Sequence, residues 1–522
     1  MHERAYNELL AVDDILQLEA DDAISRVGDL IDLSTDLKRK EGLHRAIDWC
    51  GQLKAIALSI SQQATLCYFE GNAWSAIRQL RHKAGGDVWE WEQVELEKEI
   101  ICLRLATRAA GVPNFPSQRL CQIYTNLGNC FSHIGRFVEA LWYYDKALVI
   151  LPDFGMAKGN KAITLSDYAR TLYDDGHACI FLKQAHGILK TALEHPLELG
   201  ASERFSRESN WIESVLRPDF LSTPTDLDNF PMGSNEEEKA YRAWCLQERL
   251  FLNPLNDLGK FPIANRDVLT APSIVVGLDE GPYYPALFNA LKQEYVSARF
   301  LLYAGIKAVG PHFSDRDVLL YNTLDYPAYG LATEQVKIAF RMAYSIFDKV
   351  AFFLNHYLEL RIPERRTYLR TIWFKNGKKK VDLLSEFKSK ENLSMRGLYW
   401  LSKDLFCDDE EFREAIEPNA RDLYEHRNHL EHKYLKLHMD EWAGPLALQD
   451  TFRKAMRDSP VFSVYRRDFE VSALSIMRLA RAALIYLSLG VHIEERHKAK
   501  GRDSNAVVMP VWMDTWEDHW KW

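Results

Sequence analysis

The sequence has 522 residues, of which 47% are hydrophobic and 27% are charged, and its formal net charge is −9 at pH 7. This length predicts two to four domains, because a single hydrophobic core stops growing at about 250–300 residues. The composition is that of an ordinary soluble globular protein and excludes a disordered or membrane-embedded chain. The acidic balance leaves a nucleic-acid ligand open, because local charge decides such contacts.

Targeting and metal-binding signals are sparse. The first ten residues, M-H-E-R-A-Y-N-E-L-L, are charged and lack the apolar core of a secretory signal. The longest apolar stretch, residues 482–493, is too short to span a bilayer and predicts a buried helix. The eight cysteines form no C-x-x-C pair, so neither a zinc ribbon nor a disulfide framework is indicated. We therefore expect a cytoplasmic protein with reduced, mostly buried thiols.

The N-terminal part predicts a helical repeat. Residues 121–152 read C-Q-I-Y-T-N-L-G-N-C-F-S-H-I-G-R-F-V-E-A-L-W-Y-Y-D-K-A-L-V-I-L-P and closely resemble one tetratricopeptide repeat (TPR), in which Gly128 and Ala140 let two antiparallel helices approach. One repeat cannot bury its own faces. We therefore interpret residues 1–200 as a short TPR-like helical solenoid, with an irregular helical bundle as the alternative. A solenoid of this kind binds a peptide, a protein or a nucleic acid, and the sequence leaves these open.

The helical periodicity fades over residues 201–236, where Pro218, Pro224 and Pro231 accumulate, and this predicts a linker. The segment L-F-L-N-P-L-N-D-L follows at residues 250–258. Pro254 disfavours helical geometry at Asn253, so a short helix should end there. We expect an exposed turn that either caps the next domain or only joins it.

The C-terminal part predicts a helical domain over residues 237–497, followed by a Trp-rich tail over 498–522. Its long helical segments are suited to an antiparallel four-helix bundle. They lie at about residues 285–304, 332–360, 418–438 and 469–497. In the tail, Trp512, Trp516 and Trp520 would share one helical face, which favours docking on the protein's own surface or on a second subunit.

Asp348 lies inside an apolar run at the centre of the second predicted helix. A buried carboxylate needs a partner, because an unpaired buried charge is very costly. We expect Arg299 or Arg427 to supply it. The alternative places Asp348 at the edge of the buried face, paired with its neighbour Lys349.

The third predicted helix contains R-N-H-L-E-H at residues 427–432. Arg427 and His432 diverge by about 140° on one straight helix, whereas Asn428 shares a face with His432, and Arg427 shares one with Glu431. A phosphoryl-transfer site would therefore need a second copy of the helix, related by two-fold symmetry. An Arg suits phosphate oxygens, and a His suits proton transfer near neutral pH. A solvated charged helix face is the alternative.

This hexamer within a helical bundle resembles the R-x(4–6)-H signature of the HEPN superfamily (higher eukaryotes and prokaryotes nucleotide-binding). The segments L-F-L-N-P-L-N-D-L and F-D-K-V-A-F-F-L-N-H-Y resemble a bacterial HEPN branch fused to TPR-like helices, and the resemblance covers about residues 237–495. It implies a dimeric, metal-independent endoribonuclease without a cofactor, of the kind found in toxins and abortive-infection systems. It assigns Arg427 to the scissile phosphate, His432 to proton transfer and Asn428 to orientation.

The sequence departs from the family pattern just before this hexamer. Some HEPN members carry E-x(3)-K-R, whereas this chain has Asp422 and His426 at the corresponding positions. The roles of Asp422 and His426 therefore stay open, and His429 competes with His432 as the functional imidazole. Because His426, His429 and His432 recur every three residues, a metal site is a weaker alternative.

A basic segment at residues 361–380, R-I-P-E-R-R-T-Y-L-R-T-I-W-F-K-N-G-K-K-K, predicts a small hairpin with Asn376-Gly377 at its turn. Its cations would follow an RNA backbone while Tyr368, Trp373 and Phe374 stack on bases. A solvated insertion is the alternative. The expected RNA-binding residues are Arg365, Arg366, Arg370, Lys375, Lys378 and Lys379.

Together these patterns predict an all-α protein with an N-terminal TPR-like solenoid and a C-terminal HEPN-type bundle. Its expected activity is RNA cleavage by 2′-hydroxyl attack, in anti-phage defence or toxin-like growth arrest. The solenoid would sense a protein or phage-derived trigger, and the chain would act as a homodimer or higher oligomer without a membrane. The alternative is a non-catalytic adaptor whose bundle only binds nucleotide or RNA or dimerises.

Overall fold

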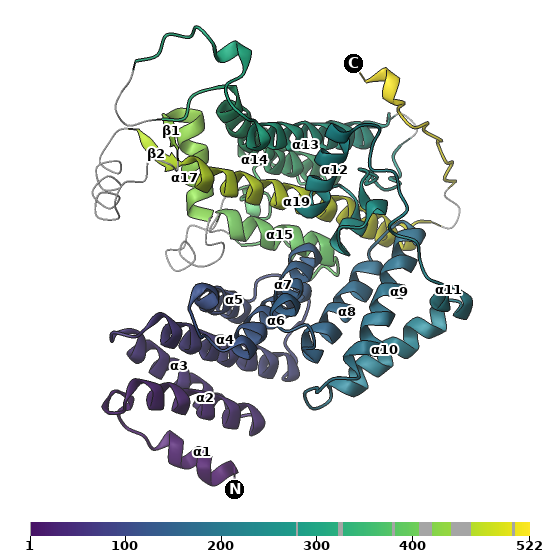
Figure 1. Ribbon diagram of the computed structural model, residues 1–522. Helices are drawn as coiled ribbons and strands as arrows, with labels where there is room; N and C mark the ends of the chain where they lie inside the picture. Colours follow the sequence, from purple (N-terminus) through teal and green to yellow (C-terminus); the bar gives the residue numbers. More distant parts are fainter. Residues whose placement is uncertain are drawn as a thin grey trace.

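The computed structural model is predominantly helical, as predicted (Figure 1). It describes residues 2–277, 280–321, 327–377, 382–406, 420–439, 461–503 and 507–521. Within the helix at 420–432, the side chains of residues 420–422, 424 and 432 also lie outside the description.

The N-terminal half is a stack of helices in which each helix packs on the next along the chain. Its helices are α1 (His2–Leu10), α2 (Ala20–Asp36), α3 (Lys40–Lys54), α4 (Ile60–Lys83), α5 (Val94–Ala106), α6 (Ser117–His133), α7 (Phe137–Ile150), α8 (Gly155–Ala169), α9 (Asp175–Ala192) and α10 (Ala201–Val215). The segment predicted as a linker begins with α10, which packs against α8 and α9. It continues with the short α11 (Pro218–Ser222).

The segment that resembles a repeat forms the helical hairpin α6–α7. Gly128 is required there, because a Cβ atom at this position would lie 2.5 Å from the ring of Tyr144 on α7. Gly128 therefore allows the close approach that its sequence pattern predicted.

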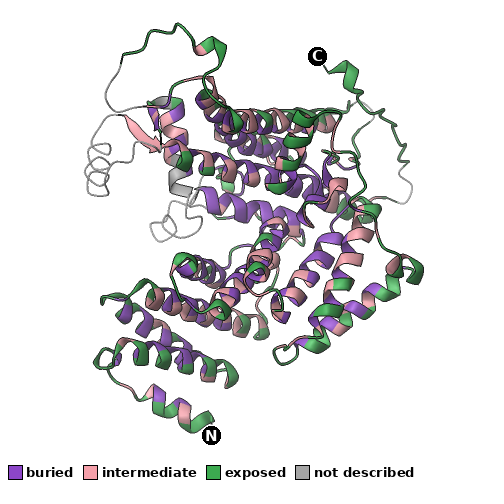
Figure 2. Ribbon diagram, viewed as in Figure 1, coloured by how far each residue is buried: buried purple, intermediate pink, exposed green. Residues whose placement is uncertain are grey.

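The C-terminal half is a bundle around α19 (Arg466–Lys500), which packs against α13, α14 and α15. The other helices are α12 (Glu236–Gln247), α13 (Tyr283–Lys307), α14 (Leu331–Tyr357), α15 (Leu393–Phe406) and α17 (Ala420–His432). By length and composition α19 could cross a membrane, but most of its apolar stretch is buried inside the protein (Figure 2). Its burial confirms the predicted buried helix over residues 482–493.

Two details of the predicted bundle are wrong. The helix expected over residues 418–438 ends at His432, and Leu435–His438 forms strand β1, which pairs in parallel with β2 (Phe462–Tyr465). Leu435 and Leu437 are buried on this strand, so the two-residue period of a strand replaces the helical one. The bundle also contains α15, which the sequence did not predict.

The turn expected to be exposed at Asn253-Pro254 is buried between the two halves. Arg481 of α19 donates to the carbonyl oxygens of Phe251 (2.6 Å) and Asn253 (2.9 Å) and to Asp257 Oδ1 (2.6 Å). Tyr168 of α8 donates to Asp257 Oδ2 at 3.2 Å. The segment therefore joins the helical stack to the bundle.

The Trp-rich tail does not form the predicted helical stripe. Residues 507–517 have no regular secondary structure, and the short 3₁₀ helix Asp518–Trp520 follows them. Pro510 removes a backbone donor and clashes with a preceding carbonyl, which prevents a helix through this segment. Trp512 is 91% exposed, so it does not dock on the protein's own surface.

Candidate functional site

The helix that carries R-N-H-L-E-H packs against α14, α15 and α19. Leu423 and Leu430 are buried and anchor α17 to the bundle. Arg341 of α14 donates to the carbonyl oxygen of Leu430, near the C-terminal end of α17. Because the last carbonyls of a helix lack intrahelical partners, this bond fixes the end of the helix that holds the motif.

Arg427 opens into a cavity of about 330 Å³ between α14, α17 and the start of the basic segment. The cavity is lined by Tyr344, Ser345, Asp348, Lys349, Phe352, Glu364, Thr367, Arg427 and Glu431. The predicted phosphate-binding arginine and the predicted RNA-binding segment therefore border one space.

The guanidinium of Arg427 is held on two sides. Its Nε lies 3.2 Å from Glu431 Oε2, as their shared helix face predicted, and its Cζ lies 5.1 Å from the centroid of the Tyr344 ring. The side chain is still 27% exposed. A planar cation held in this way keeps some of its five donors available to a phosphate.

Asp348 faces the same cavity. Two of its three expected partners, Arg299 and Lys349, pair with other carboxylates instead. Arg299 forms a two-pronged bridge to Asp267, at 2.8 and 2.7 Å, and Lys349 pairs with Glu294. Burial raises the pKa of Asp348, and the charge of Arg427 partly offsets this. Of the three expected partners, Arg427 is the one whose charge acts on Asp348, and the described atoms of the two side chains form no salt bridge.

The described histidines of the motif region do not converge on a common point. His426 is 3% exposed and packs against the rings of Phe340, Phe462 and Phe469. Burial, assisted by His429, lowers its pKa to about 4, so it is neutral at pH 7. His426 is therefore a core residue rather than a ligand or a proton donor.

His429 is held against strand β2. Its ring stacks on Phe462 with centroids 4.5 Å apart, and its Nδ1 lies 2.7 Å from the carbonyl oxygen of Glu425. Asn428 is half-buried. The backbone of His432 is the last residue of α17, but its side chain, like that of Asp422, lies outside the described atoms. Among the described residues, no three potential ligands gather at one point.

The basic segment presents its cations to solvent and buries its largest aromatic residue. Arg365, Arg370 and Lys375 are exposed and Arg366 is half-buried. Trp373 is fully buried against Trp91, Phe387 and Tyr399, so the expected stacking of Trp373 on bases is wrong.

Part of the predicted hairpin is present in this segment. Phe374 forms an antiparallel bridge to Leu383, and Asn376 and Gly377 adopt positive φ angles of 57° and 60° in the turn. Phe374 is half-buried against Tyr399, whereas Tyr368 is exposed, with Arg370 Cζ 5.7 Å from its ring centroid. Lys378 and Lys379 lie outside the described residues.

Sequence reasoning singled out Asp348 on α14 but missed Arg341 and Tyr344 on the same helix. Arg341, Tyr344 and Asp348 recur at spacings of three and four and so lie on one helix face. Arg341 contacts the end of α17, Tyr344 contacts Arg427, and Asp348 lines the cavity. This polar stripe on an otherwise apolar helix was the available signal.

The site and its surroundings define a class of domain. A long helical hairpin, α13–α14, packs against a buried central helix and against a shorter helix that carries Arg427 at a cavity. A family model described as LA2681-like HEPN matches residues 275–494, which begin before α13 and end within α19. This part of the chain therefore belongs to the HEPN superfamily. Neither the curated proteins nor the solved structures compared gave a match.

Proposed function

We propose that the protein is a metal-independent endoribonuclease of the HEPN type. Membership of the superfamily supports an RNase-type or nucleotide-binding role. The observation that carries the finer proposal is the cavity that Arg427 lines together with Glu364 and Thr367, which belong to the segment that exposes Arg365, Arg370 and Lys375. An RNA backbone that follows Arg365, Arg370 and Lys375 would bring a phosphate to the guanidinium of Arg427.

The proposed reaction uses two copies of the chain. Arg427 of one copy would bind the scissile phosphate, and His432 of the second copy would move the protons. The 2′-oxygen would form a bond to phosphorus as its proton leaves, and the bond from phosphorus to the 5′-oxygen would break as that oxygen gains a proton. The products would be a 2′,3′-cyclic phosphate and a 5′-hydroxyl. Asn428 would orient the phosphate or His432.

The proposed reaction needs a second copy of the chain because a single helix cannot bring Arg427 and His432 together. Arg427 and His432 are five residues apart on the same continuous helix, α17, so their backbone positions are about 140° apart around the helix axis. Two copies of α17 that cross would place each arginine beside the other histidine. In this proposal the N-terminal helical stack senses a protein or phage-derived trigger and controls the HEPN domain, in anti-phage defence or toxin-like growth arrest.

A specific feature also favours a second candidate, a non-catalytic adaptor that binds nucleotide or only dimerises. The cavity contains the carboxylates of Asp348, Glu364 and Glu431 beside Arg427. These carboxylates compete with a phosphate for the guanidinium. If they are not displaced, the bundle serves assembly rather than cleavage.

Cleavage of purified total RNA in the presence of EDTA separates the two candidates. We expect the parent to generate 2′,3′-cyclic phosphate ends, and Arg427→Ala or His432→Ala to lose activity by about 10² or more, because each would remove phosphate binding or proton transfer. Arg207→Ala, at an exposed arginine on α10, is the matched control and should cleave like the parent. Equal cleavage by Arg427→Ala and the parent would contradict the ribonuclease proposal.

A further inference from the structure

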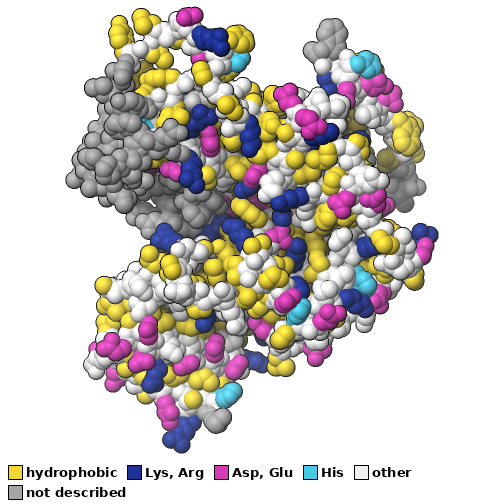
Figure 3. Space-filling view, in the orientation of Figure 1, with side chains coloured by type: hydrophobic (Ala, Val, Ile, Leu, Met, Phe, Trp, Pro, Cys, Tyr) yellow, Lys and Arg dark blue, Asp and Glu magenta, His cyan; other side chains and the backbone are white. Residues whose placement is uncertain are grey.

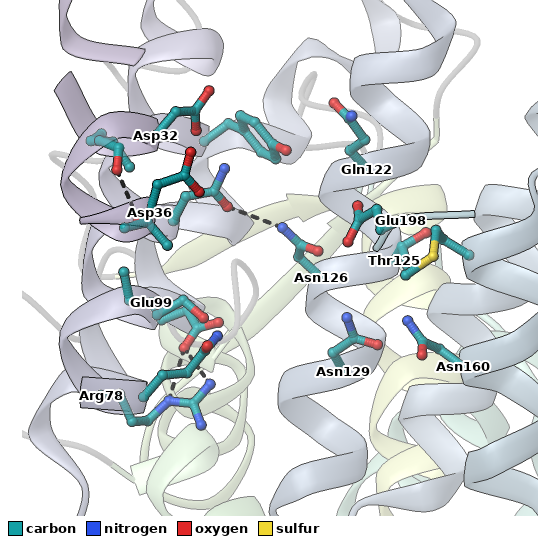
Figure 4. Close-up of a pocket in the computed structure, with 18 of the residues that line it drawn as sticks. Asp32, Asp36, Arg78, Glu99, Gln122, Thr125, Asn126, Asn129, Asn160 and Glu198 are labelled. Atoms are coloured by element: carbon teal, nitrogen blue, oxygen red, sulfur yellow. Dashed lines mark hydrogen bonds and ion pairs between the residues drawn. The ribbon is translucent and has the colours of Figure 1, made fainter. Parts of the chain in front are cut away.

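The N-terminal helical stack contains a second and larger cavity, of about 630 Å³, on helices α2, α4, α5, α6 and α8 (Figure 4). It shares no residue with the Arg427 cavity. Its volume lies in the range of protein ligand sites. Figure 4 shows Asp32 and Asp36 on the wall formed by α2, and Asn126, Asn129 and Asn160 on the wall formed by α6 and α8.

The wall on α6 and α8 presents a row of carboxamides whose orientation is fixed by the protein. Asn126 Nδ2 donates to Asn72 Oδ1 at 3.1 Å, and Asn129 Oδ1 accepts from the hydroxyl of Tyr144 at 2.8 Å. Asn129 is exposed, and Asn72 and Asn126 are half-buried. A carboxamide both donates and accepts hydrogen bonds, so such a row matches the alternating N–H and C=O groups of a polypeptide backbone.

Asn160 is the group that points to a ligand. It is only 5% exposed, it lines the cavity, and its Oδ1 has no hydrogen-bond partner among the described residues. A buried acceptor without a partner is costly, because its hydration is lost and not replaced. The acceptor therefore calls for a ligand that brings an N–H or O–H donor.

Acidic side chains line the cavity on both sides, because Asp32 and Asp36 lie on α2 and Glu198 lies beside the carboxamide wall (Figure 4). Asp32 and Glu198 are exposed and, within the described part of the chain, form no salt bridge. Asp36 lies 3.9 Å from His2 Nδ1, and the one arginine that lines the cavity, Arg78, is bound by Glu99 at 2.8 Å. The carboxylates of Asp32, Asp36 and Glu198 are thus left to attract a cation. On the face seen in Figure 3, acidic side chains recur over these N-terminal helices.

The ionisation of Asp32 agrees with this arrangement. Partial burial is the largest cause that raises the pKa of Asp32, the carboxylates of Asp29 and Asp36 raise this pKa further, and the positive charge of Arg119 lowers it. Like charges held together in this way repel one another. A bound cation would relieve that repulsion.

We propose that this cavity binds an extended polypeptide segment that carries lysine or arginine side chains. The carboxamides of Asn126, Asn129 and Asn160 bind its backbone, and Asp32, Asp36 and Glu198 bind its cationic side chains. A nucleic acid is excluded by charge, because its phosphates would face carboxylates. The site is separate from Arg427, so this proposal holds whether or not the HEPN domain cleaves RNA.

Binding to the full-length protein tests the proposal directly. The probes are two fluorescein-labelled octapeptides, one of four Ala-Lys repeats and one of four Ala-Glu repeats, and the readout is fluorescence anisotropy. We expect the Ala-Lys peptide to bind at least about tenfold more tightly than the Ala-Glu peptide, because only its ammonium groups complement the carboxylates.

Two sets of variants locate the site. The double variant Asp32→Asn/Asp36→Asn should weaken the Ala-Lys complex by about tenfold. The matched control Glu41→Gln/Asp48→Asn removes the same charge from exposed positions on α3 and should bind like the parent. If both double variants weaken binding equally, the attraction comes from the overall negative charge and the proposed site is wrong.

Asn160→Leu tests the contact with the backbone. It replaces an unsatisfied acceptor with an apolar side chain of similar size, so the melting temperature should stay the same or rise while peptide affinity falls at least about threefold. The polyamine spermine carries cations but no amide backbone, so its affinity should not change in this variant. Unchanged affinity of Asn160→Leu for the peptide would overturn the assignment of a polypeptide ligand.

Discussion

At the scale of the residue, the described histidines of α17 have different environments. His426 is buried among the rings of three phenylalanines, and His429 stacks on one of these rings, that of Phe462. The sequence placed both on the motif helix but could not distinguish them, because the rings come from α14, β2 and α19. Arg427 is 27% exposed and contacts Tyr344 and Glu431, and its assignment to the scissile phosphate stays a prediction.

The environment of His426 predicts a pH-dependent stability. Burial lowers its pKa from 6.5 to about 4 in the folded protein, so between these values the unfolded chain binds more protons. The contribution of neutral His426 to the free energy of unfolding is fully present above pH 6.5 and is lost as the pH falls toward 4. The loss is about 3 kcal/mol in total, of which about 2 kcal/mol is lost by pH 5. His426→Phe should abolish this part of the loss, as measured by urea unfolding at pH 7 and pH 5.

The control for this prediction keeps the histidine and changes its neighbour. Phe340→Leu loosens the same aromatic cluster but leaves His426 to titrate. It should be less stable than the parent at both pH values and keep most of the parent's loss between them. A loss in His426→Phe as large as in the parent would show that other groups cause the pH dependence.

At the scale of the element, local patterns were predicted well and long-range pairings were not. The hairpin α6–α7 follows from spacing within about thirty residues, since small and aromatic positions decide how closely its helices pack. The end of α17 was missed because β1 pairs with β2, which lies 27 positions further along the chain. No local sequence pattern predicts a partner strand at that distance. The burial of Trp373 against Trp91 could not be predicted for the same reason, because the two residues are far apart in the sequence.

The α6–α7 hairpin gives a stability prediction with a matched control. Gly128→Ala would place a methyl group 2.5 Å from the buried ring of Tyr144, whose hydroxyl is tied to Asn129, so we expect a loss of about 1–3 kcal/mol. Gly187→Ala lies in α9, where a Cβ would meet nothing within 4 Å, and it should stabilise the protein by about 0.5–1 kcal/mol. Urea unfolding of the two variants measures both, and equal effects would contradict the packing argument.

At the scale of the whole molecule, the two halves share one hydrophobic core and one buried ionic cluster. Most of the buried apolar residues from Ala64 to Val491 form a single cluster, whereas α1 to α4 have a smaller core of their own. In the ionic cluster, Asp404 of α15 accepts from Arg104 of α5, at 3.1 and 2.9 Å, and from Arg136 before α7. The sequence could not predict this cluster, because its partners lie 300 and 268 positions apart.

The cluster continues into the centre of the HEPN bundle. Arg136 donates to Glu139, and Glu139 accepts from the hydroxyl of Tyr486 on α19. Burial alone would lower the pKa of Arg136, but Asp404 and Glu139 raise it, so the guanidinium stays charged. Since α15 also packs against α17, the cluster gives the N-terminal stack a rigid connection to the helix that carries Arg427.

Asp404 therefore offers the sharpest test of how the halves are joined. Asp404→Asn would leave Arg104 and Arg136 buried without their shared counter-charge, and we expect it to cost about 3–5 kcal/mol. Asp48→Asn, at an exposed position on α3, should change stability by less than about 0.5 kcal/mol. The double variant Asp404→Leu/Arg104→Leu removes one charge of each sign and keeps the Arg136–Glu139 pair, so it should recover part of the loss.

Hydrogen exchange then shows where the connection fails. In Asp404→Asn, backbone amides of α15 and α17 should lose protection first, because the cluster holds the end of α15 against α5 and α7. Amides of α2 and α3, which belong to the separate N-terminal core, should exchange as in the parent. Equal loss of protection in α2 and α15 would mean that the molecule unfolds as one unit and that the cluster does not specifically couple the stack to the Arg427 helix.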